Sequence, residues 1–376
     1  RVAEPLGRCE EVLSSEGRVN LGGPAKAKAL VARFGDKGFD YTGNSRVDLV
    51  VWRHARRARV VNASAALARQ AGEVAILDAH WPGAGFELSA WVKALRLHQW
   101  LKNLLVFLPL LAAHRFTDFA AVSLAVLAFL AFGLCASGVY VINDLLDLQS
   151  DRHHSRKRHR PFASGRLPIL QGMLVAPLLT VAGFTLASWA APAFAAVLAL
   201  YWLATFGYSL WFKRMEMLDV CVLAGLYTVR IIGGAVAVSV PLSFWLLAFS
   251  MFLFLSLAIL KRYTELAGLV GKGREHASGR GYATADLPLL QSLGAASGYI
   301  AVLVLALYIN SPDSVELYAR PQVLWLLCPL LLYWVSRAWS VAHRGKMHDD
   351  PVVFAVTDPV SQVVAGLCGL VVLGAI

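Results

Sequence analysis

Four polar residues that follow a long apolar stretch have the types and spacing of a metal-binding motif. The chain reads Asn143-Asp144-Leu-Leu-Asp147-Leu-Gln-Ser-Asp151 at this point. On a helix the three aspartates occupy positions i, i+3 and i+7, so their carboxylates are expected on one face, with the Asn143 amide one position away. Oxygen-only ligands suit Mg²⁺, which typically joins one or two carboxylates to substrate phosphates. The motif therefore predicts a magnesium site made of Asn143, Asp144, Asp147 and Asp151.

A strongly basic loop follows the acids directly. It reads Arg-His-His-Ser-Arg-Lys157-Arg-His-Arg160-Pro-Phe-Ala-Ser-Gly-Arg from position 152 to position 166. A metal on one side of a phosphate and guanidinium or ammonium groups on the other would hold that anion from both sides. Lys157 and Arg160 are therefore predicted to bind substrate. The alternatives are a solvated helix end with incidental acids and a loop that is basic only because of membrane topology.

Two further polar groups occur in or beside apolar stretches. Gln-Trp-Leu-Lys102-Asn103 precedes one of them, and Tyr227-Thr-Val-Arg230 lies within another. An arginine at membrane depth is expected to face a cavity and to pair with an acid or an anionic substrate. Lys102 and Arg230 are predicted to be catalytic, and Asn103 and Tyr227 to contact substrate. The alternatives are an interfacial anchor for Lys102 and a structural ion pair between Arg230 and Asp219.

A third polar group, Lys261-Arg262-Tyr263, closes the apolar stretch that begins near residue 243. All three side chains are predicted to contact substrate, because they would lie on the same side of the membrane as the acidic motif. The alternative is that long basic side chains at a span end reach into the lipid head-group region and have no ligand.

Long apolar stretches position these groups. The hydrophobic fraction is 57% and only 16% of residues are charged, well outside the range of ordinary soluble domains. Stretches of bilayer length recur from residue 99 onward, and they predict an all-α membrane protein with a nine-helix transmembrane bundle. The predicted spans are residues 99–113, 119–142, 168–190, 192–212, 217–238, 243–260, 289–309, 321–336 and 360–376.

The charges of the loops predict the orientation of the bundle. Loops after the second, fourth, sixth and eighth spans are rich in lysine and arginine, whereas the other loops carry only Arg115 and Arg320. By the positive-inside rule, the acidic motif and the N-terminal region face the cytoplasm in the inner (plasma) membrane. The formal charge of +11 reflects this topology, because basic and aromatic residues do not interleave as they do on nucleic-acid-binding surfaces. Nucleic acid is therefore not an expected partner, and the oligomeric state is left open.

The acidic motif, the Arg-Pro-x-Ala-x-Gly loop and the nine spans resemble the UbiA-type membrane prenyltransferase superfamily over residues 91–376. The resemblance implies a helical bundle around a cavity that opens to the cytoplasm and sideways to lipid. The superfamily usually carries a second Asp-rich motif after its sixth span, and here that place holds Lys261-Arg262-Tyr263-Thr-Glu265. This departure, together with Asp349-Asp350-Pro-Val-Val-Phe-Ala, resembles the branch that transfers phosphoribose to decaprenyl phosphate.

That branch implies a Mg²⁺-dependent transfer of phosphoribose from phosphoribosyl diphosphate to a polyprenyl phosphate, with release of pyrophosphate, in cell-wall biosynthesis. Asp144 and Asp147 would hold the metal ion, while Lys102 and Arg230 would position the phosphates. An anionic acceptor needs no strong general base. The alternative is a prenyltransferase that moves a prenyl group from its diphosphate to an aromatic or haem-type acceptor. A transporter is disfavoured because the acids lie at a span end and not at the membrane midplane.

The N-terminal region is less apolar and is predicted to form a small soluble α/β segment. Residues 1–70 contain Lys26 and a Gly43-Asn44-Ser-Arg-Val-Asp48 loop, and they resemble the late part of a haloacid-dehalogenase-type hydrolase. Such enzymes need an early Asp-x-Asp motif, which is absent here, so a truncated or inactive segment is expected. A chance Asn/Asp loop is the alternative. Residues 71–90, with Trp81-Pro-Gly-Ala-Gly, are predicted to be a linker.

Overall fold

The computed structural model of the protein describes residues 22–83, 87–154, 156–270, 281–347 and 350–376. Contacts between Cα atoms divide the chain into two compact units. One consists of residues 1–88 with 165–167, and the other of residues 89–164 with 168–376. Each unit has its own core and is described separately below.

The N-terminal unit contains a three-stranded parallel sheet in the order β1-β2-β3. Parallel strands need a crossover, and α3 supplies the one between β2 and β3. Val51, Trp52 and Val60 are 0% exposed and form the centre of its core. The elements of this unit are α1 (Gly23–Phe34), β1 (Asp40–Gly43), η2 (Arg46–Asp48), α2 (Leu49–Trp52), β2 (Arg57–Ala63), α3 (Ala65–Val74) and β3 (Ile76–Pro82).

The region expected to be a linker is largely part of this unit. The end of α3 and the whole of β3 lie within residues 71–83, where β3 pairs with β2 along the sheet. The Pro-Gly turn signal marks the end of β3 and not a longer irregular stretch. The assignment of the unit as a truncated soluble hydrolase segment stays a prediction.

The second unit is built from helices joined by turns and loops. Its helices are α4 (Leu88–Leu95), η3 (Leu97–Phe107), α5 (Leu108–Ala112), α6 (Phe119–Leu146), α7 (Leu148–His153), η4 (Lys157–His159), α8 (Ile169–Ala190), α9 (Pro192–Leu210), η5 (Phe212–Arg214), α10 (Leu218–Ala237), α11 (Phe244–Val270), η6 (Thr284–Asp286), α12 (Leu287–Ile309), α13 (Pro312–Leu317), η7 (Pro321–Leu326), α14 (Leu327–His343), α15 (Pro351–Thr357) and α16 (Pro359–Ala375).

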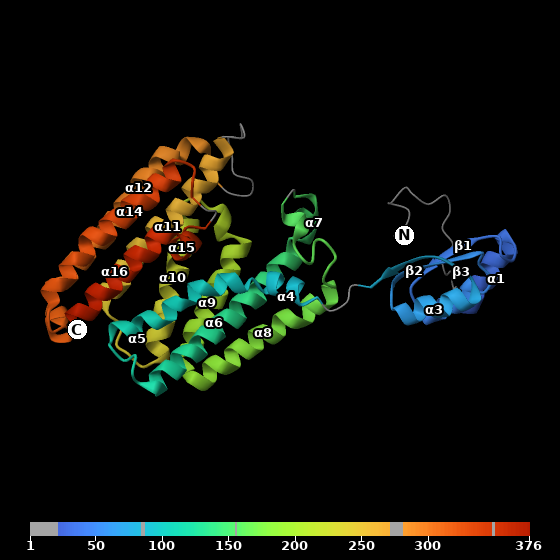
Figure 1. The fold of residues 1–376 in the computed structure, drawn as a ribbon, viewed down its shortest axis with the longest axis horizontal. Helices are drawn as coiled ribbons and strands as arrows, with labels where there is room; N and C mark the ends of the chain where they lie inside the picture. The colour runs from blue at the N-terminus through green and yellow to red at the C-terminus, as the bar shows by residue number, and fades with distance from the viewer. Residues whose placement is uncertain (1–21, 84–86, 155, 271–280, 348–349) are drawn as a thin grey trace. The chain divides into compact units, whose positions relative to one another are not determined.

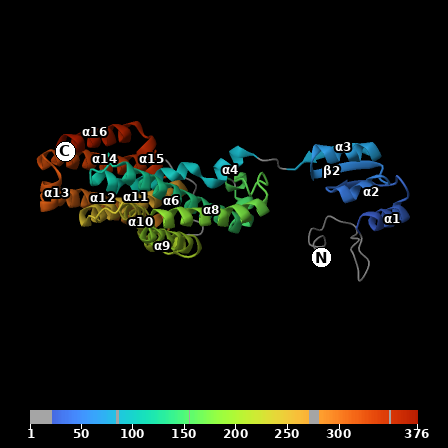
Figure 2. The same cartoon turned by 90° about the horizontal axis from the view of Figure 1, so that it is seen from below.

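The long helices pack in two groups joined by α10. One group is α6, α8 and α9, and the other is α11, α12, α14 and α16; α10 contacts both α9 and α11 (Figures 1 and 2). The first group packs around Phe132, Phe194 and Tyr201, and the second around Ile231 and Leu260. α10 is therefore surrounded by protein on several sides, which makes it the natural carrier of buried polar residues.

The number of spans differs from the nine that the sequence predicts. Within the described residues, seven helices are long and apolar enough to cross a membrane, or eight if the bent pair α15–α16 counts as one span. The helix predicted over 99–113 is not a long α-helix: it is the 3₁₀ segment η3 followed by the five-residue α5. Pro109 lacks a backbone N–H and fits only the first turn of α5, so the α-helix cannot extend back through it.

Close contacts hold η3 against the bundle. A Cβ atom on Gly234 of α10 would lie 2.1 Å from the Val106 carbonyl oxygen, so only glycine allows this approach. On the other side, Trp100 Nε1 donates a 3.0 Å hydrogen bond to Ser137 Oγ of α6, over the bare face of Gly133. The packing places η3 between α6 and α10, and it thereby brings the polar residues of η3 to those of both helices.

Candidate functional site

The helix that carries the acidic motif ends inside the motif. α6 stops one residue before Asp147, whose backbone (φ −86°, ψ 7°) leaves the α-helical path. Asp144 is 3% and Asp151 0% exposed, whereas Asp147 is only partly buried. Across the described residues, no three His, Cys, Asp or Glu side chains lie close enough to hold one metal ion together. The common face predicted for the three aspartates requires an unbroken helix, and α6 ends before Asp147.

Asp144 and Asp151 nevertheless meet at one guanidinium group. Arg160 Nη1 lies 2.7 Å from Asp151 Oδ2 and 3.2 Å from Asp144 Oδ1. Among the described residues, the buried Asp151 Oδ1 has no hydrogen-bond partner. A buried carboxylate oxygen without a donor is costly, and a cation is a fitting partner for it. The carboxylate oxygens of Asp144 and Asp151 are therefore of the type that Mg²⁺ prefers as ligands, although only two of the three predicted acids are brought together.

The amide of Asn143 is fixed toward α9. Its Nδ2 atom donates a 2.9 Å hydrogen bond to Ser209 Oγ, and the Ser209 hydroxyl in turn donates to the Thr205 carbonyl oxygen. Because that hydroxyl has used its proton, Asn143 must be the donor of the pair. Its carbonyl oxygen Oδ1 is thus turned away from Ser209 and remains suited to coordinate a cation.

A second arginine, Arg96, reaches the acids from outside the predicted motifs. Its Nη2 atom lies 2.6 Å from Asp144 Oδ1, and its guanidinium carbon lies 4.8 Å from the centre of the Tyr140 ring. Its backbone is left-handed (φ 51°), a conformation that residues other than glycine rarely adopt. The sequence feature that could have identified Arg96 as a site residue is its position just before the first apolar stretch. By contrast, the predicted Lys157 is exposed on η4 and forms no ion pair with any described residue.

Two lysines and one aspartate form a second charged group. Lys102 Nζ lies 2.7 Å and Lys261 Nζ 3.2 Å from the same atom, Asp350 Oδ2. The lysines come from η3 and α11, and the aspartate is the N-cap of α15, where its Oδ1 accepts a hydrogen bond from the Val352 amide. The structure brings the two predicted lysines together, and it adds Asp350, for which the sequence indicated no site role.

The charges of this group act on their neighbours. Burial alone would raise the pKa of Asp350, but the Lys261 and Lys102 ammonium groups outweigh it and hold that pKa well below its usual range. The pKa of His98 is lowered, first by burial and then by the charges of Arg96 and Lys102, against the opposing effect of Asp350. His98 therefore lies within electrostatic reach of Arg96 and of the Lys102–Asp350 pair, in a net positive environment.

Arg230 is the most unusual cation of the bundle. It is 5% exposed and donates to three uncharged oxygens: Asn103 Oδ1 at 2.9 Å, the Leu226 carbonyl and the Tyr201 hydroxyl at 2.9 Å. In the part of the chain that the structure describes, no carboxylate forms an ion pair with it. The alternative of an Arg230–Asp219 pair is wrong, because Asp219 instead bonds Arg262. A buried guanidinium without a carboxylate partner is suited to bind an anion.

Asn103 and Tyr227 connect this arginine to the lysine pair. Asn103 is 1% exposed, and its Nδ2 atom has no hydrogen-bond partner among the described residues. The Tyr227 ring lies between two cations, 5.8 Å from Lys102 Nζ and 5.7 Å from the Arg230 guanidinium carbon. The structure therefore brings Asn103 and Tyr227 beside Lys102 and Arg230, and the amide donor without a partner is suited to an acceptor such as a phosphate oxygen.

Arg262 and Tyr263 lie elsewhere, although they follow Lys261 directly. Arg262, 2% exposed, bonds Asp219 Oδ2 at 2.6 Å, the Tyr208 hydroxyl and the Glu265 carboxylate. The Tyr263 hydroxyl hydrogen-bonds to His343 Nδ1 at 3.1 Å. Consecutive helical residues point about 100° apart, which explains why only the first of the three faces Lys102. The structure therefore gives no support to the predicted substrate contacts of Arg262 and Tyr263.

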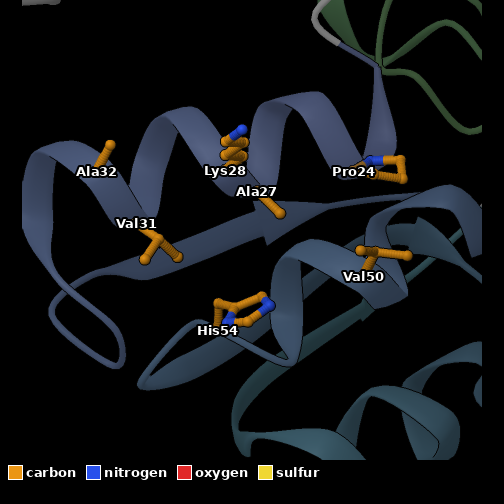
Figure 3. Close-up of a pocket in the computed structure, with 7 residues that line it drawn as sticks. All are labelled: Pro24, Ala27, Lys28, Val31, Ala32, Val50 and His54. Carbon is orange, nitrogen blue, oxygen red and sulfur yellow. The ribbon is translucent and has the colours of Figure 1, made fainter.

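The N-terminal unit has a pocket of its own, of about 440 Å³ (Figure 3). Figure 3 shows Ala27 and Val31 of α1 facing Val50 and His54 across it. Most of its lining is apolar, and its basic side chains are those of a lysine and a histidine. The lining residues are Pro24, Ala27, Lys28, Val31, Ala32, Val50 and His54. In the same unit Asp48 accepts hydrogen bonds from Tyr41 and from two backbone amides, which hold the Asn44–Asp48 loop closed.

Comparison with protein families and curated sequences identifies relatives of this chain. The sequence pattern of the UbiA prenyltransferase family matches residues 104–357. The uncharacterised protein y4nM of Sinorhizobium fredii is 36% identical over 96% of this chain and 70% of its own length. Nodulation protein NoeC of Azorhizobium caulinodans is 39% identical over 75% of this chain and 92% of its own. The decaprenyl-phosphate phosphoribosyltransferase of Mycolicibacterium smegmatis is 31% identical over 73% of this chain and 89% of its own.

Among solved structures, a UbiA homolog from Archaeoglobus fulgidus bound to GPP and Mg²⁺ superimposes with a TM-score of 0.57. It covers 76% of this chain and 97% of that one at 16% identity, a level at which the likeness concerns the fold alone.

Proposed function

Because the chain belongs to the UbiA prenyltransferase family, we propose that it moves phosphoribose from phosphoribosyl diphosphate to a polyprenyl phosphate and releases pyrophosphate. It is a transferase by family and a multi-pass membrane protein by its apolar helices. The relative from Mycolicibacterium smegmatis, named a decaprenyl-phosphate phosphoribosyltransferase, supports this choice of substrates. NoeC and y4nM are comparably or more similar, so the choice rests chiefly on the charges of the site.

The observation that carries the proposal is the excess of buried or partly buried cations over carboxylates. Lys102, Lys261 and Arg230 gather around Tyr227, and among the described residues only Asp350 pairs with any of them. A prenyl diphosphate has two phosphates, and an aromatic or haem-type acceptor adds none. Phosphoribosyl diphosphate and a lipid phosphate together bring four. The surplus of positive charge matches the more highly phosphorylated pair of substrates.

Mg²⁺ is the proposed cofactor, held by Asp144 and Asp151 with the carbonyl oxygen of Asn143. Asp147 stays a predicted ligand, which a change at the end of α6 would have to bring into place. When bound, the ion would neutralise charge on the leaving pyrophosphate. The unpartnered Asp151 Oδ1 supports a cation here, and so does the Mg²⁺ bound to the Archaeoglobus fulgidus homolog.

The side chains themselves supply position and charge. The cations around Tyr227 would orient the acceptor phosphate. Arg96 and Arg160 would contact the diphosphate at the acid group, which consists of Asp144 and Asp151. The acceptor oxygen forms a bond to C1 of the ribose as the bond from C1 to the diphosphate oxygen breaks. Because the acceptor is already an anion, no side chain has to remove a proton. Proximity and charge neutralisation would provide most of the rate.

The choice of donor tests the proposal directly. Purified protein, Mg²⁺ and polyprenyl phosphate are incubated with radiolabelled phosphoribosyl diphosphate, and the lipid phase is counted. Label in the lipid is expected. If the lipid stays unlabelled and a prenyl group is instead transferred from its diphosphate to an aromatic or haem-type acceptor, the alternative function replaces this one.

The acid group is tested by Asp144→Asn, which should lower turnover about 10³-fold, because it removes charge from the proposed metal and arginine site. Asp118→Asn is the matched control: Asp118 caps the opposite end of α6 and pairs with Arg115, and its loss should leave turnover nearly unchanged. Equal activity of both variants would exclude the acid group from the site.

We also propose that the protein lies in the plasma membrane with this site on the cytoplasmic side, as the basic loops indicate. Lys157→Cys, in a background without the native cysteines, places a thiol on the exposed η4. An impermeant maleimide should label it in inverted vesicles and not in intact cells. The reverse pattern would contradict the orientation.

A further inference from the structure

Asp350 occupies the position where two lysines of the site converge. Lys102 and Lys261 come from η3 and α11, and their ammonium groups lie 2.7 and 3.2 Å from a single oxygen, Asp350 Oδ2. Two cations from separate elements that meet at one oxygen form the geometry of an anion site. In this structure the anion is a side chain of the protein itself.

A second aspartate in the same segment shows that helix capping does not require this arrangement. Asp350 and Asp358 each cap a helix that begins with proline, α15 and α16. Asp358 uses both oxygens to bind the Arg337 guanidinium, at 2.7 and 3.0 Å. Asp350 instead divides its oxygens: Oδ1 caps α15 through the Val352 amide, and Oδ2 faces the lysines. The oxygen that faces the lysines is therefore not needed for the cap.

A phosphate group and this carboxylate would compete for the same two ammonium groups. Asp350 is 7% and Lys102 9% exposed, so their interaction is weakly screened by solvent. A phosphate brought to the lysines would meet a carboxylate of like charge at contact distance, and like charges that close repel strongly. A phosphate could therefore bind tightly only if Asp350 Oδ2 moved away from the two lysines. If Oδ2 stayed in place, the phosphate would bind more weakly.

We propose that Asp350 is a specificity-determining residue that acts as an exchangeable counter-ion: its carboxylate holds the lysine pair until a substrate phosphate takes its place. The inference rests on the proposed function, because it assumes a phosphate-bearing substrate at this group. Asp350 neutralises the buried Lys102 and the partly exposed Lys261 while the site lacks substrate, and it weakens the binding of every phosphate at this position. Anions with too little charge to displace it are excluded.

The test is Asp350→Asn, which keeps the shape and the capping oxygen and removes only the charge. Binding is measured on the intact protein in detergent, separately for phosphoribosyl diphosphate with Mg²⁺ and for polyprenyl phosphate. At least one of them should bind about tenfold more tightly than to the wild type, and that one identifies the phosphate at the lysines. Unchanged or weaker binding of both would overturn the proposal, since a purely structural role predicts no gain.

Asp358→Asn is the matched control, because it removes a capping carboxylate and an ion pair of the same segment away from the lysines. Both affinities should stay within about twofold of the wild type. A comparable gain in this variant would assign the effect to general loosening of α15 and α16, and would also overturn the proposal.

If Asp350→Asn does not fold, a second pair of variants gives the answer. Lys261→Met leaves one lysine with one carboxylate, and adding Asp350→Asn to it removes the competing charge without leaving two unpaired lysines. The double variant should bind the phosphate more tightly than Lys261→Met alone; equal binding would contradict the exchange. Failure of the wild type to bind either compound would instead reject the proposed function, which keeps the two claims separable.

Discussion

Two buried arginines on adjacent helices, Arg230 of α10 and Arg262 of α11, have opposite surroundings. Arg262 bonds two carboxylates and a tyrosine hydroxyl, and Tyr282 donates to one of those carboxylates, Asp219, at 2.6 Å. Arg230 is as deeply buried but bonds only an amide, a carbonyl and a hydroxyl oxygen. The first is a closed network that needs nothing more. The second is a charge that the described part of the protein does not neutralise.

We interpret the difference as one between a structural residue, Arg262, and a candidate site residue, Arg230. Taking a charge out of water costs several kcal/mol, and nearby carboxylates offset that cost only when the geometry is good. The Arg262 network achieves this between α10, α11 and the residue Tyr282 before η6. At Arg230 the offset is missing, which is expected where an anionic substrate supplies it during turnover. Burial and residue type alone would not have told the two arginines apart.

Breaking the closed network should have the largest effect. Arg262→Met removes the guanidinium that bonds the Asp219 carboxylate, which is 0% exposed, and should destabilise the fold by about 3–5 kcal/mol. Thermal unfolding in detergent measures it as a large fall in midpoint. Adding Asp219→Asn should recover part of the loss. An unchanged midpoint for Arg262→Met would show that the network does not stabilise the bundle.

Removing the open charge should instead affect turnover. Arg230→Met is expected to lower the transfer rate about 10²–10³-fold, as for the loss of a group that stabilises negative charge in a reaction. Its unfolding midpoint should stay the same or rise, because an uncompensated buried charge has been removed. The opposite result, a lower midpoint with normal turnover, would make Arg230 a scaffold residue like Arg262.

Placing a carboxylate beside Arg230 should have the smallest effect of the three. Asn103→Asp keeps the oxygen that accepts from Arg230 Nε and adds the missing carboxylate beside it. Turnover should fall about tenfold or more, since the new charge repels a substrate phosphate, while the unfolding midpoint should hold or rise. Asn310→Asp, a change of the same kind at an exposed asparagine, should alter neither quantity. Full activity in Asn103→Asp would mean that no anion approaches Arg230.

Much of the site follows from residue type and spacing. The acidic motif, Arg160 and the cations Lys102, Arg230 and Lys261 are all predicted as site residues, because charge in an apolar stretch needs a reason. The family, the transferase class and the multi-pass membrane character are confirmed by the comparisons and the helices. The roles of the individual residues and the magnesium site stay predictions.

What was missed depends on contacts distant in sequence or on breaks in regular structure. Arg96 and Asp350 reach their partners over 48 and 248 positions, which no local pattern shows. α6 ends one residue before Asp147, so one unbroken helix does not carry all three aspartates, and η3 is not an α-helix although its composition suits a span. Arg262 carries the same charge as Lys261 but points to a different side of α11, and the sequence alone does not show which side faces the site.

The most direct test of the proposed transfer is an assay with two labels on one donor. Phosphoribosyl diphosphate carries ¹⁴C in the ribose and ³²P in the β-phosphate, and it is incubated with the protein, Mg²⁺ and polyprenyl phosphate. We expect ¹⁴C to enter the lipid phase while ³²P stays in water as pyrophosphate, in equal molar amounts. Labels that remain together in water, or that enter the lipid together, would contradict the transfer of phosphoribose.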